Sequence, residues 1–71
     1  MDTKTKELVA IGASVTANCV PCMEYHTARA REAGASDTEI ADAVAMGRKV
    51  RQGAAKVWDD GVAELLNEGQ E

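Results

Sequence analysis

The only proline of the chain, Pro21, limits where a helix can begin, and it lies between two cysteines in the sequence Cys19-Val20-Pro21-Cys22. Proline has no backbone N–H and clashes with the preceding turn, so an α-helix tolerates it only in the first turn. A helix should therefore begin at about Val20 or Pro21. This start places Cys19 at or just before the N-cap and Cys22 inside the first turn.

The residues before the cysteine pair predict another helix, over residues 3–17, because apolar side chains recur on one stripe at Leu8, Ile11 and Val15. We expect Thr3 or Thr5 to cap this helix. Asn18 tolerates the left-handed conformation that often ends a helix. The two helices should therefore form a hairpin around the cysteines.

The residues after Gly34, which should end the second helix, predict a third one. Ser36 and Glu39 have the spacing of a capping box. An apolar stripe then continues to about Asn67, and glycines near Met46-Gly47 or Gln52-Gly53 make a break plausible. No strand pattern occurs in the sequence. The predicted fold is a single all-α domain over residues 1–71.

Small residues also recur every seven positions along this third helix, at Gly47, Ala54 and Gly61. Such a row can form a notch for close packing of another helix, although three unrelated small residues in an alanine-rich helix explain it equally well. Tyr25 and Trp58 are interpreted as packing residues rather than catalytic ones.

The composition predicts an obligate homo-oligomer and excludes some partners. The 71-residue chain has no phenylalanine, and much of its apolar content is alanine, which buries little area. The net charge of −4 and the single basic cluster at Arg48, Lys49 and Arg51 argue against nucleic-acid binding. No apolar run approaches the length of a membrane span. We expect a cytoplasmic protein, and in that compartment a CxxC pair is usually redox-active or metal-binding.

The cysteine pair forms part of a larger pattern, Glu7-x11-Cys19-x2-Cys22-x3-His26. On a helix, His26 lies one turn after Cys22 and can take its thiol proton, while Glu7 could orient the imidazole. A helix N-terminus also favours a thiolate. We therefore assign Cys22 as the nucleophile and Cys19 as the residue that resolves its sulfenic acid. The reverse order of the two cysteines stays open.

One difficulty concerns the reach between Glu7 and His26. In a hairpin that turns near Val20, their distances from the turn along the helix axis differ by roughly 10 Å, at about 1.5 Å per residue. Long side chains, an inclined helix crossing or a bridging water could close this gap, or a neighbouring subunit could supply the glutamate.

Two other interpretations compete with the redox one. The four residues Cys19, Cys22, His26 and Glu7 could hold a metal ion, although the position of His26 departs from the usual ligand spacing of structural zinc sites. Alternatively, the chain is a helical oligomerisation unit whose cysteines are inert.

The combined pattern resembles the signature of the alkylhydroperoxidase D branch of the carboxymuconolactone decarboxylase-like family. Beyond Glu7 and His26, the resemblance includes Ala17-Asn18-Cys19-Val20-Pro21-Cys22, Ala33-Gly34-Ala35 and Glu39-Ile40-Ala41-Asp42-Ala43-Val44. It covers about residues 7–55. The larger peroxidases have further helices that this chain lacks, so the resemblance places the substrate pocket largely between subunits.

The resemblance implies an all-helical domain that assembles into trimers or hexamers. It implies reduction of a hydroperoxide or a disulfide without a bound cofactor or metal, with electrons from a dithiol donor such as a lipoyl protein or thioredoxin. It gives Cys22 the sulfenic acid, Cys19 the resolving role, and Glu7 and His26 the proton relay. Decarboxylase relatives act on a lactone and lack the cysteine pair.

Overall fold

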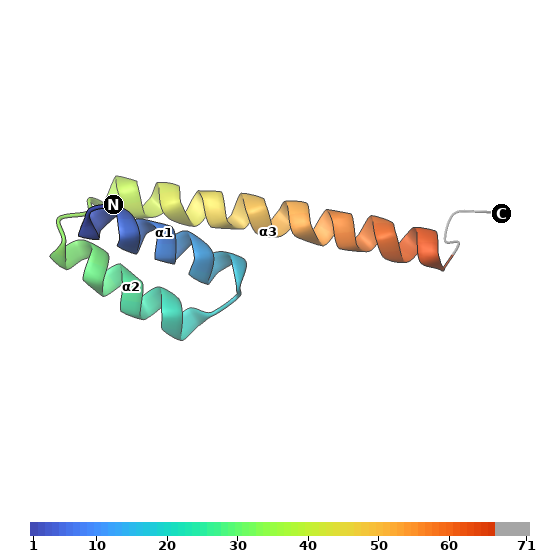
Figure 1. Ribbon diagram of the computed structural model, residues 1–71, viewed down its shortest axis with the longest axis horizontal. Coiled ribbons are helices and arrows are strands. Elements are labelled where there is room, and N and C mark those ends of the chain that lie inside the picture. Colours follow the sequence, from blue (N-terminus) through green and yellow to red (C-terminus); the bar gives the residue numbers. More distant parts are fainter. Residues whose placement is uncertain (67–71) are drawn as a thin grey trace.

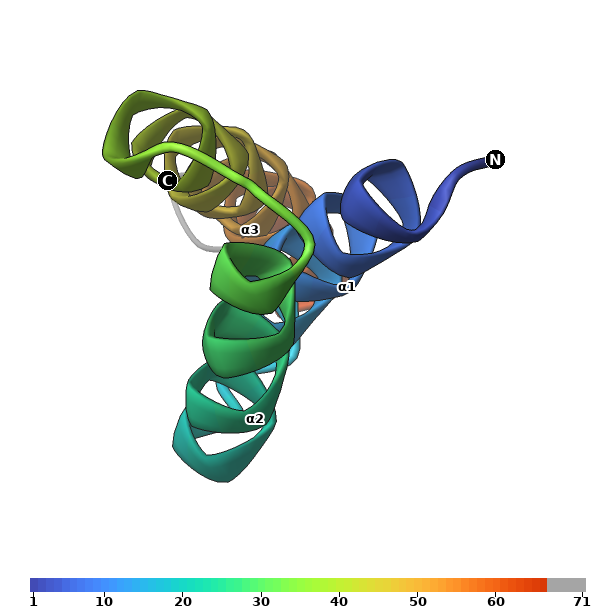
Figure 2. The ribbon, with the colours of Figure 1, turned by 90° about the vertical axis from the view of Figure 1, so that its left-hand side faces the viewer.

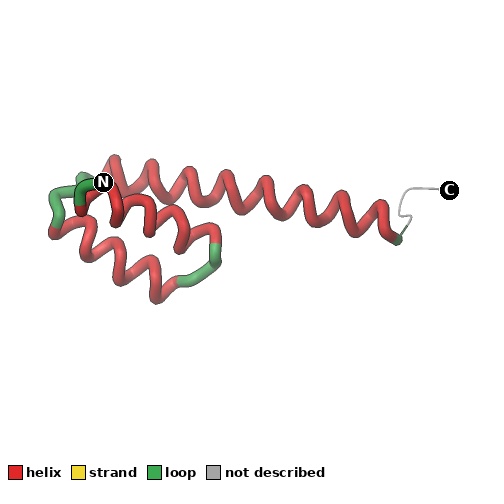
Figure 3. The backbone as a smooth tube through the Cα atoms, viewed as in Figure 1, coloured by secondary structure: helices red, strands yellow, loops and turns green. Residues whose placement is uncertain are grey.

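The computed structural model describes residues 1–66 and contains three α-helices, α1 (Thr3–Thr16), α2 (Val20–Glu32) and α3 (Asp37–Leu65) (Figure 1). The segments that join the helices are short, and this part of the chain contains no strand (Figure 3). The predicted all-α fold, with a helical hairpin around the cysteines and a long third helix, is confirmed.

The N-cap of α1 is Asp2, whose side chain accepts a hydrogen bond from the backbone N–H of Thr5 at 2.8 Å. The prediction that Thr3 or Thr5 caps this helix was wrong, because Thr3 is already helical and Thr5 supplies the N–H that is capped. A carboxylate also interacts favourably with the positive end of the helix dipole. After α1, Asn18 has a φ of 57°, the left-handed conformation that the sequence predicted.

The start of α2 follows the prediction from Pro21. Cys19 is the N-cap residue and Pro21 lies in the first turn. The backbone N–H of Cys22 donates a hydrogen bond to the sulfur of Cys19 at 3.3 Å. The helix ends at Glu32, and Gly34 then adopts a φ of 93°, which L-residues rarely adopt.

The predicted capping box begins α3. The Ser36 hydroxyl accepts from the N–H of Glu39 at 3.1 Å, and the Glu39 carboxylate accepts from the N–H of Ser36 at 2.9 Å. The break considered near Gly47 or Gly53 does not occur, because α3 is continuous to Leu65. A helical glycine costs only about 1 kcal/mol relative to alanine, so one glycine does not interrupt the hydrogen-bond ladder. The predicted end at about Asn67 lies outside the described residues.

The core forms around α1, which packs against both α2 and α3 (Figure 2). Ile11 of α1 is fully buried. The surrounding side chains come from all three helices and from the loop before α3: Ala30, Ala35 and Ile40 are buried, and Leu8, Met23, Ala43 and Val44 are partly buried. This small core fixes how α1 and α2 lie beside each other, and so positions the cysteine pair.

α1 and α3 pack closely at Gly47. A Cβ atom at this position would lie 2.5 Å from the carbonyl oxygen of Gly12 and 2.7 Å from the Cβ of Val15. Of the small residues that recur every seven positions, Gly47 therefore permits close packing within the chain. A Cβ added at Gly61 would meet nothing within 4 Å.

The C-terminal half of α3 extends beyond the ends of α1 and α2 (orange to red in Figure 1), and the molecule measures 55 × 20 × 20 Å. Three large apolar side chains on this half are exposed, Val57 by 74%, Trp58 by 69% and Leu65 by 78%. Trp58, interpreted as a packing residue, thus makes little contact within a single chain. None of the helices in residues 1–66 has the length and hydropathy to cross a membrane, and the cytoplasmic location stays a prediction.

Candidate functional site

The two cysteines form a disulfide at the N-terminus of α2, with 5.3 Å between their Cα atoms. The cap geometry places them together, because Cys19 is the N-cap and Cys22 follows three residues later. Cys22 is exposed, whereas Cys19 is half-buried. Cys22 is therefore the residue of the pair that a reactant can approach more easily.

The carboxylate of Glu7 on α1 contacts the imidazole of His26 on α2. The distance from Glu7 Oε2 to His26 Nδ1 is 2.7 Å. A carboxylate can only accept at neutral pH, so the Nδ1 proton belongs on the imidazole, and the lone pair of the neutral ring is then on Nε2. Because residues four apart share a helix face, this imidazole lies on the face of α2 that carries Cys22.

Glu7 and His26 lie closer together along the hairpin than the sequence predicted. Both residues belong to one chain, so this contact does not need a neighbouring subunit. Glu7 lies nine residues before the end of α1, and His26 lies six residues after the start of α2. At about 1.5 Å per residue, this offset is only about 4.5 Å, which two side chains can span. The larger estimate counted residues 17–19 as helical rise, whereas these residues form the turn.

Arg29 is a third member of this cluster, and the sequence interpretation missed it. Its Nε donates a hydrogen bond to Oε1 of Glu7 at 3.0 Å. The hydrogen bond from His26, and then that from Arg29, lower the pKa of the Glu7 carboxyl. Only 12% of the Glu7 side chain is exposed. The site thus holds a carboxylate that stays ionised between two donors.

Tyr25 lies beside the same cluster. Its ring meets the His26 ring edge to face, with 5.0 Å between the centroids, and the Arg29 guanidinium carbon is 5.6 Å from the Tyr25 centroid. The helical spacing alone could have predicted that Arg29 lies beside these two rings, since it follows Tyr25 by four residues and His26 by three.

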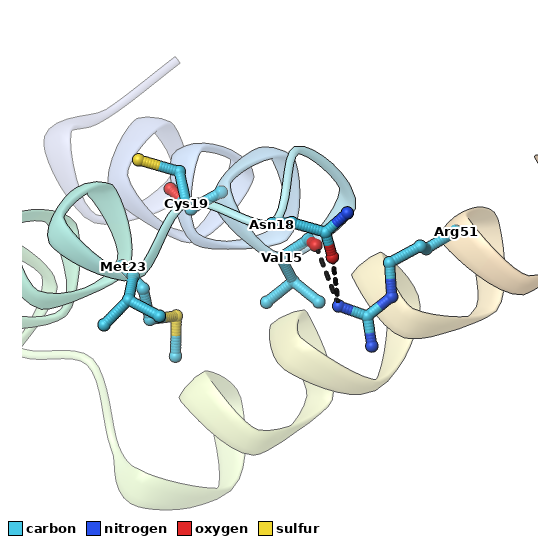
Figure 4. A pocket seen from close by; sticks show the side chains of 7 residues that line it. Val15, Asn18, Cys19, Met23 and Arg51 are labelled. Carbon is cyan, nitrogen blue, oxygen red and sulfur yellow. Dashed lines mark hydrogen bonds between the residues drawn. The ribbon is translucent and has the colours of Figure 1, made fainter.

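A pocket of about 230 Å³ lies between α3 and the turn that carries Cys19 (Figure 4). Cys19 and Met23 line it together with Arg51. The Nη1 group of Arg51 donates hydrogen bonds to the carbonyl oxygen of Val15 at 3.2 Å and to Oδ1 of Asn18 at 2.9 Å. Arg51 therefore connects α3 to the turn that carries Cys19.

The residues proposed as metal ligands lie in two different arrangements. Cys19 and Cys22 are bonded to each other, and Glu7 pairs with His26 and Arg29. Across residues 1–66, no group of three or more histidine, cysteine or acidic side chains is placed to hold a metal ion. The geometry brings together a disulfide and an acid–base pair.

Comparison with known proteins places the chain among related sequences. The model of the Carboxymuconolactone decarboxylase family matches residues 1–64. The chain is also 31% identical over 68 residues to a protein of Paracoccus denitrificans named "Uncharacterized protein 4 in cox locus". This match covers 96% of the chain and 61% of that protein, so the chain spans about three fifths of its relative. No solved structure matches the chain.

Proposed function

This chain belongs to the carboxymuconolactone decarboxylase family, and from that premise we propose that it is an alkylhydroperoxidase D-like thiol oxidoreductase. It reduces hydroperoxides or disulfides through a dithiol–disulfide cycle of Cys22 and Cys19. The observation that carries this proposal is the Glu7–His26 pair, whose imidazole follows Cys22 of the CxxC disulfide by one turn on the same face of α2. A proton acceptor next to an accessible cysteine is the arrangement that activates a thiol.

The oxidative half of the cycle begins with the reduced protein. His26 accepts the Cys22 thiol proton at Nε2, while Glu7 holds the imidazole through Nδ1. The Cys22 thiolate attacks one oxygen of the hydroperoxide, and the O–O bond breaks. The leaving alkoxide takes the proton from His26 and departs as an alcohol, and Cys22 becomes a sulfenic acid.

Cys19 then resolves the sulfenic acid. Its sulfur attacks the Cys22 sulfur, the hydroxyl of the sulfenic acid leaves with a proton as water, and the disulfide forms. The short separation within the first turn of α2 supports this step, since the backbone already holds the two Cα atoms 5.3 Å apart. The cycle consumes one hydroperoxide and leaves the protein oxidised by two electrons.

A dithiol donor, such as a lipoyl protein or thioredoxin, completes the cycle. One donor thiolate attacks the sulfur of Cys22, which belongs to the more exposed residue. Cys19 leaves as a thiolate, which the Cys22 N–H at the helix N-terminus favours. The second donor thiol then attacks the mixed disulfide, which releases Cys22 as a thiolate and the donor as a disulfide. This asymmetry supports Cys22 as the residue that exchanges with external partners.

We also propose that the protein works as a homo-oligomer, a trimer or hexamer. The exposed Val57, Trp58 and Leu65 on the projecting half of α3 support this assembly. Large apolar side chains are usually left this exposed in numbers only where another surface covers them.

Other functions of the family and the chain receive less support. A lactone decarboxylase has no use for a cysteine pair beside a Glu–His pair. A metal-binding protein would need the reduced cysteines to rearrange around an ion together with His26 and Glu7. A purely structural unit would not need the exposed Cys22.

The proposal is tested by following hydroperoxide consumption with an excess of a small dithiol as the electron donor. We expect turnover by the wild-type protein and none by the variant Cys22→Ser. Reduced Cys19→Ser that has been freed of dithiol should react with one equivalent of hydroperoxide and stop at the Cys22 sulfenic acid, which dimedone traps. Full turnover by Cys22→Ser would refute the assignment, and a sulfenic acid trapped on Cys19 would reverse the order of the cysteines.

A further inference from the structure

The pocket lined by Cys19 contains a guanidinium that no carboxylate of residues 1–66 neutralises. Arg51 is half-buried at the pocket wall. The hydrogen bonds from its Nη1 go to two neutral oxygens, of Val15 and Asn18. The ion pairs within residues 1–66 do not include Arg51, so Nε and Nη2 are available to a ligand.

The other walls of the pocket are mainly apolar, with Val15, Val20 and Met23 among the lining residues. At about 230 Å³, the pocket is smaller than the roughly 300–1,000 Å³ that encloses a drug-sized ligand. A short aliphatic chain that ends in a carboxylate matches both the small apolar pocket and the positive charge of Arg51. Its anionic end would bind the fork of N–H donors of Arg51, and its methylene groups would contact the apolar wall.

The oxidation state of the site indicates which reactant would use this pocket. The structure contains the disulfide, and the next reactant of an oxidised thiol enzyme is its reductant. We propose that the Arg51 pocket binds the carboxylate of a small thiol donor, and so selects carboxylate-bearing aliphatic thiols as reductants of the Cys19–Cys22 disulfide. This inference rests on the proposed function and assigns it a small thiol acid as the electron donor, in place of the lipoyl protein or thioredoxin named above.

The orientation of Cys19 sets a requirement on the length of the donor. In Figure 4 the sulfur of Cys19 points away from the Arg51 guanidinium. A donor anchored at Arg51 must therefore carry its thiol several carbon atoms from the carboxylate. Its thiolate attacks the Cys22 sulfur, the S–S bond breaks, and Cys19 leaves as a thiolate. A second donor thiolate then releases Cys22 and forms the donor disulfide.

The test compares two thiols of equal length, 6-mercaptohexanoate and 6-mercaptohexanol, as reductants of the oxidised protein. Each rate is divided by the rate of the same thiol with a small-molecule disulfide. We expect the acid to react about fivefold faster, the size of effect given by a partly exposed ion pair. The opposite preference is expected without a specific site, because the net charge of −4 repels an anion. Mercaptoacetate, which is too short to reach, should show no advantage.

Variants of two arginines on α3 complete the experiment. The readout is the ratio of the normalised rates with the acid and the alcohol. Arg51→Gln should abolish this preference for the acid, whereas Arg51→Lys should keep part of it. Arg48→Gln removes the same charge from a residue that does not line the pocket. This control variant should keep the full preference for the acid. No preference in the wild-type protein, or the same preference in Arg51→Gln, would overturn the proposal. If Arg51→Gln does not fold, a preference that is reduced in Arg51→Lys and unchanged in Arg48→Gln supports the site, and a wild-type preference in Arg51→Lys overturns it. A protein that shows the preference but does not react with hydroperoxide would refute the peroxidase function alone.

Discussion

The Glu7 carboxylate on α1 lies 2.7 Å from the His26 imidazole on α2, across 19 residues of sequence. The hydrogen bond joins the two helices that flank the cysteine pair, and it fixes which imidazole nitrogen faces away from the carboxylate. Glu7 is therefore both a structural tie and the partner of the acid–base residue.

Removal of the imidazole should slow the reaction with hydroperoxide, although both cysteines remain and can still form the disulfide. We expect His26→Ala to lower kcat/KM for a hydroperoxide by about 100-fold or more, the usual contribution of a general base. The variant should also lose the limb of the pH–rate profile that reports deprotonation of the base. An unchanged profile would exclude His26 from the relay.

Removal of the Glu7 charge should have a smaller effect, because Gln keeps a hydrogen-bond acceptor. We expect Glu7→Gln to lower kcat/KM by about 10-fold, since the imidazole is held less firmly and its protonated form is less stabilised. The matched control is Glu24→Gln, which removes an exposed carboxylate from α2. Equal losses in the two variants would point to net charge rather than the relay.

The same carboxylate makes the stability depend on pH. The pKa of Glu7 is lowered in the folded protein by its hydrogen bonds to His26 and Arg29. The contribution of the ionised Glu7 to the free energy of unfolding is complete above its pKa in the unfolded chain, about 4.3. This contribution is lost as the pH falls through its lower pKa in the folded protein. The Tm of the wild-type protein should exceed that of Glu7→Gln at pH 7, and the difference should shrink at pH 3. A difference that grew on acidification would contradict this account.

The contact between α1 and α3 predicts opposite effects for two glycines of α3. Gly47→Ala places a Cβ 2.5 Å from the carbonyl oxygen of Gly12, and should destabilise the protein by about 1–3 kcal/mol. Gly53→Ala meets nothing within 4 Å, and should stabilise it by about 0.5–1 kcal/mol through helix propensity. Urea unfolding measures both, and equal effects would refute the packing argument.

The projecting half of α3 predicts self-association. Sedimentation of the wild-type protein at micromolar concentration should give a trimer or hexamer. Trp58→Lys should shift the distribution towards the monomer, whereas Asp59→Lys, at a neighbouring exposed position, should shift it less. A stable folded wild-type monomer would contradict the proposed assembly.

Much of the fold could be predicted because single residues set the helix boundaries. Pro21 fixed the start of α2, Gly34 supplied its end, and Ser36 with Glu39 began α3. The cap of α1 could not be chosen from sequence, since Asp2 and two threonines lie within four positions and all of these residue types cap helices. The glycines of α3 suggested a break that does not occur, because the cost of about 1 kcal/mol for a helical glycine is too small to end the helix.

The site was less predictable than the helices that carry it. The pattern from Glu7 to His26 named the residues, but their contact depends on residues 17–19 adding no helical rise. Arg29 joins the cluster because α1 presents Glu7 to it. Arg51 reaches the turn at Asn18 from 33 residues away, a contact that no local pattern contains.

The most direct test of the thiol cycle is the mass of the freshly reduced protein before and after one equivalent of an organic hydroperoxide, followed by peptide mapping. The account predicts rapid loss of two hydrogen atoms, a bridge between Cys19 and Cys22, and its reversal by a dithiol. An unchanged mass, or a mass that includes a bound metal ion, would contradict the redox cycle.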